Sequence, residues 1–128
     1  MGTRTRLMLT CCLAGLLALG TAASVHAHDA SAETQQGYAS FYADKFQGRT
    51  TASGVPFDQN RLTAAHRHLP FGTEVEVERP DTGQKVTVVI NDRGPFVRGR
   101  IIDLSKRAAR KLGLLDRGVA PVVVTQIN

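Results

Sequence analysis

The sequence predicts a mainly β domain, a small closed barrel of six short strands with one short helix. Short runs of alternating or continuous apolar residues recur between turn formers along the last part of the chain, about ninety residues, as expected for an all-β barrel. Residues 73–79 alternate cleanly, with Val75 and Val77 on one side and three glutamates on the other, which is typical of a half-buried strand. Closure is favoured because an open sheet of this size would leave its edge strands exposed.

The first 27 residues have the composition of a secretory signal peptide. Arg4 and Arg6 precede an apolar run over 7–19, and Val25-His26-Ala27 provides a small-x-small cleavage site. No other segment approaches the ~20 apolar residues that a membrane-spanning helix needs. We therefore expect cleavage after Ala27, export to the periplasm or cell envelope, and no transmembrane segment in the mature protein.

Both cysteines, Cys11 and Cys12, lie in this signal. The mature domain therefore has no thiol, which excludes disulfides and thiol catalysis. A cysteine in such a signal could instead be lipidated. Both cysteines, however, lie in the middle of the apolar run, and no small residue stands just before Cys11, which follows Thr10. We expect a protein without a lipid anchor. Loss of the two cations Arg4 and Arg6 lowers the formal charge from +5 to +3, which fits an anionic polymer partner without identifying one.

The remaining elements follow in order. Residues 28–36 are small and polar and predict a flexible tether, so the folded domain is expected over 37–128. Strands are predicted at 37–43, 62–66, 73–79, 84–90 and 119–127, with a surface loop at 44–54 and a hairpin turn at 80–83. Ser105 can cap a helix over 106–112 that stops at Gly113. The expected core consists of Val75, Val77, Val86, Val88, Ile90, Ile101, Leu104, Val122 and Val124.

The chemistry-bearing residues gather in 89–105, where a polar turn separates two apolar strands. Residues 91–95 combine an acid, a base and turn formers, which is how a rigid framework presents a reactive loop. Asp103 stands among three apolar neighbours. An ionised carboxylate in that setting needs either a structural partner or a chemical role, and the sequence leaves both open.

Six blocks of the chain resemble one known family in their order and spacing. They are GYASFY at 37–42, TASG at 51–54, LTAAH at 62–66, LPFGT at 69–73, NDRGPF at 91–96 and IDLS at 102–105. Together they closely resemble the rare lipoprotein A family (RlpA-like proteins) from Gly37 to the C-terminus. The resemblance implies a double-psi β-barrel related to those of expansins, barwin-like proteins and some lytic transglycosylases. It also implies an exported envelope protein that acts as an endolytic lytic transglycosylase on peptidoglycan strands lacking stem peptides.

The resemblance assigns three catalytic positions. The catalytic acid of the NDRGPF block falls on Asp92, the histidine of the LTAAH block on His66, and the expansin-like aspartate on Asp103. One position departs from the family, because the glutamate that many members have after the TASG block is Val55 here. Val55 supports an alternative function, an expansin-like module that binds peptidoglycan or loosens the wall without turnover.

The chemistry of the residues agrees with a single-acid mechanism. Hydrolysis of a glycosidic bond generally takes two carboxylates, whereas a lytic transglycosylase uses the C6 hydroxyl of the substrate itself as the nucleophile. One acid that later accepts a proton can then suffice, and Asp92 could fill that role. It must hold a proton near neutral pH, which burial or the neighbouring carboxylate of Asp103 would favour. The competing interpretation is that Asp92 caps a turn and pairs with Arg93 or Arg98.

Candidate substrate contacts and ligands complete the set. Tyr42, Thr51, Arg93 and Phe96 are the expected substrate-binding residues, although aromatic residues at such spacing are more often core. His66 and His68 could face one metal ion, but no third ligand is evident. We therefore expect no metal or cofactor, a groove position for His66 with a hydrogen bond to Asp92 or to sugar, and an exposed His68.

The expected partner is peptidoglycan glycan. Export and basic residues that are scattered along the chain disfavour nucleic acid. We also expect a monomer, without targeting by a C-terminal peptidoglycan-binding repeat.

Overall fold

The structure, a computed structural model, describes residues 33–128. The predicted signal peptide, its two cysteines and residues 28–32 of the predicted tether lie outside this range. The strands are β1 (Thr34–Phe41), β2 (Thr63–Ala65), β3 (Glu74–Glu78), β4 (Lys85–Asp92), β5 (Arg100–Leu104) and β6 (Ala120–Gln126). The helical elements are the 3-10 turn η1 (Asp44–Phe46) and the α-helix α2 (Lys106–Lys111). No helix among the described residues is long and apolar enough to cross a membrane.

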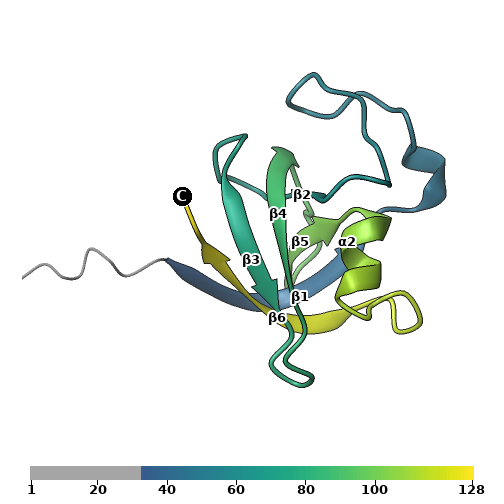
Figure 1. Ribbon diagram of the computed structural model, residues 1–128. Helices are drawn as coiled ribbons and strands as arrows, with labels where there is room; N and C mark the ends of the chain where they lie inside the picture. The colour runs from purple at the N-terminus through teal and green to yellow at the C-terminus, as the bar shows by residue number, and fades with distance from the viewer. Residues whose placement is uncertain (1–32) are drawn as a thin grey trace, which may run out of the picture. The chain divides into compact units, whose positions relative to one another are not determined.

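The six strands close into a barrel in the order β1-β5-β2-β4-β3-β6 (Figure 1). Two pairs, β1 with β5 and β2 with β4, are parallel, and the other four are antiparallel. Of these six strands, only β3 and β4 are both consecutive in the sequence and neighbours in the barrel, so the other connections must cross from one part of the barrel to another. The longest joins β1 to β2 over residues 42–62 and rises beside α2 at the upper right of Figure 1. The predicted closed barrel with one short α-helix is confirmed.

The strand register brings several of the predicted site residues close together. Ala65 of β2 pairs with Asp92 at the end of β4 on one side and with Asp103 of β5 on the other. On the far side of β5, Asp103 pairs with Ser40 of β1, and Tyr42 follows the end of that strand. The backbones of Asp92 and Asp103 are therefore two strand spacings apart, about 10 Å.

The barrel core is apolar and follows the alternation of the strands. Eight of the nine predicted core residues are buried. Ile101 is the exception, because Ile102 and Leu104 point into the core and Ile101 packs at its edge. The period of two in β5 gives the reason: with Leu104 inside, Ile102 must be inside as well, and Ile101 and Asp103 must face outward.

Most element boundaries differ from the prediction by one or two residues, and the start of the first strand differs by three. The first strand begins at Thr34, so residues 34–36 are not part of a tether but pair with residues 123–125 of β6. Their polar side chains obscured this strand in the sequence. The loop predicted at 44–54 contains the turn η1. The predicted helix cap is confirmed, since the Ser105 hydroxyl accepts a hydrogen bond from the Ala108 amide.

Candidate active site

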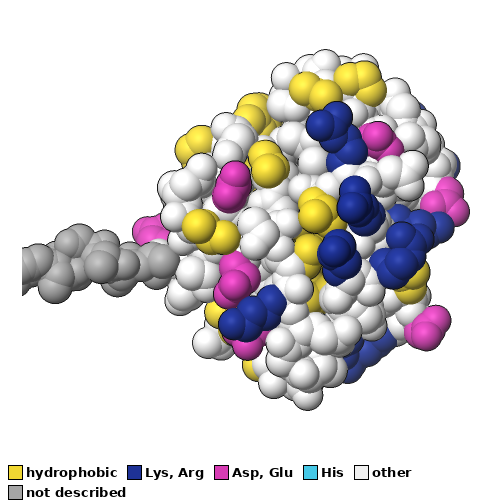
Figure 2. All heavy atoms as spheres, viewed as in Figure 1, with side chains coloured by type: hydrophobic (Ala, Val, Ile, Leu, Met, Phe, Trp, Pro, Cys, Tyr) yellow, Lys and Arg dark blue, Asp and Glu magenta, His cyan; other side chains and the backbone are white. Residues whose placement is uncertain are grey.

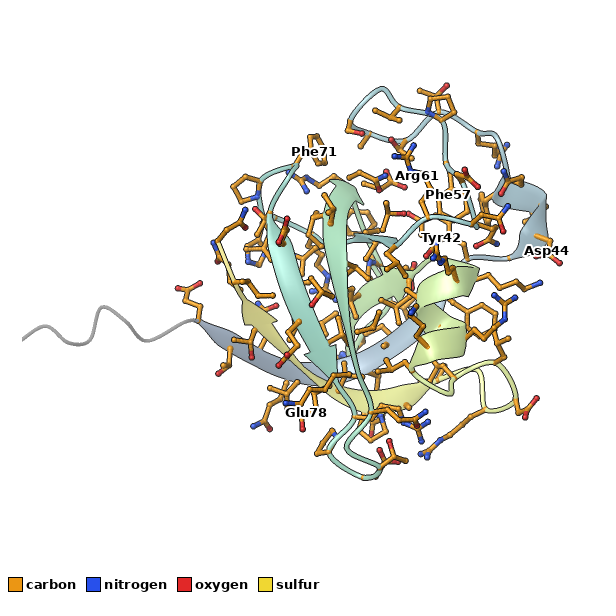
Figure 3. All side chains as sticks on the ribbon, viewed as in Figure 1. Tyr42, Asp44, Phe57, Arg61, Phe71 and Glu78 are labelled. Atoms are coloured by element: carbon orange, nitrogen blue, oxygen red, sulfur yellow. The ribbon has the colours of Figure 1, made fainter. Side chains whose placement is uncertain are left out.

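A groove of about 470 Å³ lies where the ends of β1 and β4 meet the connection between β4 and β5. Six of the seven site residues predicted from the sequence line it: Tyr42, Thr51, Asp92, Arg93, Phe96 and Asp103. Phe46, Arg49, Phe57 and Arg100 also line it. Figure 3 shows Tyr42 and Phe57 beside each other at the base of the long β1–β2 connection. The groove therefore combines two acids, several cations and an aromatic wall.

The Asp92 carboxylate is held by three hydrogen-bond donors. Oδ1 accepts from the amide of Ala52 at 2.8 Å and from the amide of Arg93 at 2.9 Å. Oδ2 accepts from the hydroxyl of Tyr42 at 2.5 Å. Two of these donors come from the β1–β2 connection, far away in the sequence, so the side chain is fixed across the groove and not only within its own turn.

Tyr42 is a fixed hydroxyl donor. Its ring stacks on Phe57 with the centroids 4.1 Å apart and meets Phe46 edge-on. Burial raises the pKa of Tyr42 far above its ordinary value, and the hydrogen bond to Asp92 and the charges of Asp92 and Asp103 raise it further. Tyr42 therefore stays protonated over the whole neutral range, and its hydroxyl donates a hydrogen bond to Asp92.

Asp103 has structural partners at the groove. The Ser40 hydroxyl donates to its Oδ1, and Arg100 forms an ion pair with the same oxygen at 3.4 Å. The Nε atom of Arg100 is buried without a partner in the described residues. Asp103 is partly buried, which places a second carboxylate in the groove but ties it to the strand beside it.

Arg93 does not pair with Asp92. Its Nη1 atom donates to the carbonyl oxygens of His66 at 3.2 Å and Leu69 at 2.8 Å, and its guanidinium lies 4.0 Å from the ring centroid of Phe71 (labelled in Figure 3). Within residues 33–128, neither Arg93 nor Arg98 makes an ion pair with Asp92. The competing interpretation, in which Asp92 pairs with Arg93 or Arg98, is therefore not what the structure shows. The Arg93 guanidinium, expected to contact substrate, binds backbone carbonyl oxygens.

His66 does not occupy the predicted position in the groove. Its ring is buried, with Nε2 2.7 Å from Oε1 of Gln35, and its Nδ1 accepts from the amides of His68 and Leu69 at 3.2 Å. The expected side-chain bond to Asp92 is absent from the described residues, and only the His66 amide donates to the Asp92 carbonyl oxygen, at 3.1 Å. The side chain of His66 is internal because β2 ends there and the turn that follows folds over the ring.

The exposed histidine was predicted correctly. His68 is exposed, and its ring meets the His66 ring edge-on with centroids 4.7 Å apart. Among residues 33–128, no three metal-binding side chains come together.

The two remaining predicted contacts, Thr51 and Phe96, have different surroundings. Thr51 is buried, and its hydroxyl donates to the Val55 carbonyl oxygen at 2.7 Å, so it shapes the loop. Phe96 is 77% exposed at the groove. An exposed aromatic ring beside a polar groove suits stacking against a sugar ring.

Sequence reasoning found Tyr42 and Thr51 of the β1–β2 connection but missed the other side chains that this connection contributes to the groove. Phe46 and Phe57 build the aromatic wall, and Arg49 places its guanidinium 5.4 Å from the Phe46 ring centroid. Their signal in the sequence is weak, because a loop has no periodicity from which the direction of a side chain can be inferred.

Val55 faces a different hollow. It lines a cavity of about 380 Å³ together with Asp58, Arg61, Thr63 and Asn91. Residues 50, 51 and 57 line the first groove whereas 55, 56 and 58 line this one, so the two hollows share one loop as a wall. The position where the family resemblance expects a glutamate is thus outside the groove that contains Asp92.

Basic residues gather on one side of the molecule. Figure 2 shows Lys and Arg side chains clustered on the right-hand side of the view, where Figure 1 places α2. Four of the six residues of this helix are basic, at 106, 107, 110 and 111. This helix therefore contributes a local group of cations to that side of the molecule.

The sequence matches a family model described as lytic transglycolase over residues 34–124. Among curated proteins, it is 57% identical over 86 residues to the probable endolytic peptidoglycan transglycosylase RlpA of Aquifex aeolicus, covering 67% of this chain and 38% of that protein. It is 52% identical over 100 residues to the endolytic peptidoglycan transglycosylase RlpA of Pasteurella multocida, covering 78% and 34%. The chain thus spans little more than a third of the length of these relatives.

Solved structures share the barrel. Streptomyces papain inhibitor matches with a TM-score of 0.61 and 28% identity, covering 75% of this chain and 96% of that one. The expansin of Clavibacter michiganensis matches with a TM-score of 0.59 and 27% identity, covering 75% and 51%, and a mutant of that expansin was solved in complex with cellohexaose. These similarities confirm the double-psi β-barrel fold.

Proposed function

The chain belongs to the RlpA-like lytic transglycosylase family, and from that premise we propose that it is an endolytic enzyme that cleaves peptidoglycan glycan strands with Asp92 as general acid and base. The observation that carries the proposal is the carboxyl of Asp92, held by Ala52, Arg93 and Tyr42 in a groove with an aromatic wall.

The reaction needs one proton carrier. Asp92 donates a proton to the glycosidic oxygen as the C1–O bond breaks, and the C6 hydroxyl of the same sugar attacks C1 and returns its proton to the carboxylate. No water is consumed, and the product ends in a 1,6-anhydro ring. Both backbone amides bind Oδ1, so Oδ2, beside the Tyr42 hydroxyl, is the oxygen that carries the proton.

Other side chains support this assignment. Tyr42 stabilises the carboxylate that forms as the proton leaves, because its hydroxyl is 2.5 Å from Oδ2. Asp103 and Phe96 line the same groove, where they bind and orient the sugars. His66 acts from behind, as a structural support of the segment that contains Asp92.

The charge of the groove supports the proposed preference for strands without stem peptides. Where the peptide is absent, the lactyl group of the sugar ends in a free carboxylate, and where it is present the same group is an uncharged amide. Arg49 is exposed and, within residues 33–128, its guanidinium makes no hydrogen bond or ion pair. An arginine of this kind is suited to a carboxylate.

The second candidate function is glycan binding or wall loosening without turnover. Two observations favour it: the family glutamate is replaced by Val55, and a related expansin was solved with cellohexaose. The wild type separates the two functions, because an enzyme releases 1,6-anhydro products from sacculi and a binding module releases none. Val55→Glu should raise this release if a carboxylate at this position assists the enzyme.

Digestion of purified sacculi, with and without amidase pretreatment, tests the enzymatic proposal. Mass spectrometry should detect 1,6-anhydro ends, in larger amounts after the amidase has removed stem peptides. Asp92→Asn keeps the shape of the side chain and should lower the rate by ~10² or more while glycan binding persists. Asp116→Asn, an exposed aspartate outside the groove, is the matched control. Wild-type activity that survives in Asp92→Asn would exclude the mechanism.

We also propose that the protein acts outside the cytoplasm, where its substrate is, as a monomer. Signal-peptide cleavage near His28 would release it, and the barrel domain would follow the new N-terminus. Mass spectrometry of the exported form tests the cleavage, and a diacylglyceryl cysteine at the mature N-terminus would contradict it.

A further inference from the structure

The hydrogen bonds around His66 connect the first strand of the barrel to the segment that contains Asp92. We propose that Gln35 is a positioning residue: it fixes the His66 ring in one tautomer, and the fixed ring holds the turn that supports the backbone of Asp92 and Arg93. The catalytic part of this proposal rests on the function proposed above.

The contacts of the ring define its tautomer. Nδ1 lies 3.2 Å from the amide nitrogens of both His68 and Leu69, and an amide can only donate, so Nδ1 has no proton. Burial lowers the pKa of His66 to about 4, with further lowering from His68, Arg93 and Arg67. The neutral ring therefore has its one proton on Nε2, which donates to Oε1 of Gln35 at 2.7 Å.

The same turn holds the catalytic segment. The His66 amide donates to the carbonyl oxygen of Asp92 at 3.1 Å. In return, Arg93 donates to the carbonyl oxygens of His66 and Leu69 at 3.2 and 2.8 Å. The Arg93 amide is itself a donor to the Asp92 carboxylate, at 2.9 Å, so a shift of the turn moves a donor of the catalytic group.

Glutamine at position 35 suits this role because it accepts a hydrogen bond without adding charge. Gln35 is half-buried, and its neighbour Gln36 is exposed on the other side of β1. The charged and titratable groups around the ring are His68, Arg67 and Arg93, with Glu33 across the small hollow that Gln35 and His68 line. A carboxylate at position 35 would face Nε2 directly and favour the imidazolium, whose Nδ1 is a donor and cannot accept from the amides of the turn.

The test compares Gln35→Glu with Gln36→Glu, which adds the same charge on the exposed side of the same strand. Ring nitrogen chemical shifts from NMR report the tautomer and pKa of His66, and release of 1,6-anhydro products reports activity against pH. We expect the Nε2–H tautomer in the wild type. Gln35→Glu should raise the His66 pKa by about one unit or more. The acid limb of the pH–activity profile should move to higher pH by the same amount. Gln36→Glu should change neither the pKa nor the profile.

A neutral variant removes the acceptor alone. Gln35→Leu should lower kcat by about threefold to tenfold, equivalent to one lost hydrogen bond, with KM unchanged. A wild-type Nδ1–H tautomer, or identical His66 titrations in the two glutamate variants, would overturn the proposal. An inactive wild type would instead reject the proposed function. The coupling would still be tested by the NMR resonance of the Arg93 amide, which should shift as His66 titrates. If Gln35 had only a local role, that resonance would not change.

Discussion

Replacement of Tyr42 by phenylalanine isolates one hydrogen bond of the groove. The Tyr42 hydroxyl is 2.5 Å from Oδ2 of Asp92, and its ring stacks on Phe57 at 4.1 Å. Phenylalanine keeps the ring and its stacking and removes only the donor. A hydrogen bond to a charged group contributes about 1.5 to 3 kcal/mol, and each 1.4 kcal/mol corresponds to about tenfold in rate. The variant should therefore lose between one and two orders of magnitude in kcat.

The assay is the rate of 1,6-anhydro product release from amidase-treated sacculi. KM and the unfolding midpoint should stay near those of the wild type, because the aromatic wall is intact. The chain provides its own control in Tyr38, the only other tyrosine, which lies outside the groove and is 48% exposed. Tyr38→Phe should behave as wild type. Full activity of Tyr42→Phe alongside an inactive Asp92→Asn would refute the idea that the hydroxyl stabilises the catalytic carboxylate.

Two further predictions concern stability. Ile102 is fully buried, so Ile102→Ala should cost about 2 to 5 kcal/mol of unfolding free energy in urea titrations, whereas the exposed Glu74→Ala should cost less than about 0.5; equal costs would contradict the inward direction of Ile102. Burial, ahead of the charges around it, lowers the His66 pKa from 6.5 to about 4, so between these pH values the unfolded chain binds a proton that the folded chain does not. The unfolding free energy should therefore fall as pH falls from 6.5 to 4 and be flat for this group above 6.5, and His66→Gln should reduce that slope.

The sequence predicts those parts of the fold in which one face of a strand is buried. The hairpin of β3 and β4 and the capped helix α2 were predicted because alternation and capping are local signals. The start of β1 was missed because Thr34, Gln35 and Gln36 are polar. Their strand conformation comes from pairing with β6, whose residues lie almost ninety positions later, and no local pattern reports such a pairing.

The site divides in the same way. The residue types of the groove could be predicted, since Asp92 and Phe96 come from a recognisable block. The direction of each side chain could not be predicted. His66 was therefore assigned to the groove, although its ring is buried against Gln35. Arg93 does line the groove, but its guanidinium binds backbone carbonyl oxygens. A motif indicates which residues are close together. Only the hydrogen-bond geometry separates those that face a substrate from those that hold the others in place.

The β1–β2 connection forms one wall of the groove, and a buried glutamine within it, Gln59, is bonded at several points. Gln59 donates through Nε2 to the carbonyl oxygen of Tyr42 at 3.0 Å, and its Oε1 accepts from the amide of Lys106 at the start of α2 at 2.7 Å. The same connection supplies Ala52 and Tyr42, two of the three donors to Asp92. The carboxylate of Asp92 is therefore already held in place by these donors, as the proposed general-acid role requires. The long loop that separates two strands in the sequence is what completes the site in space.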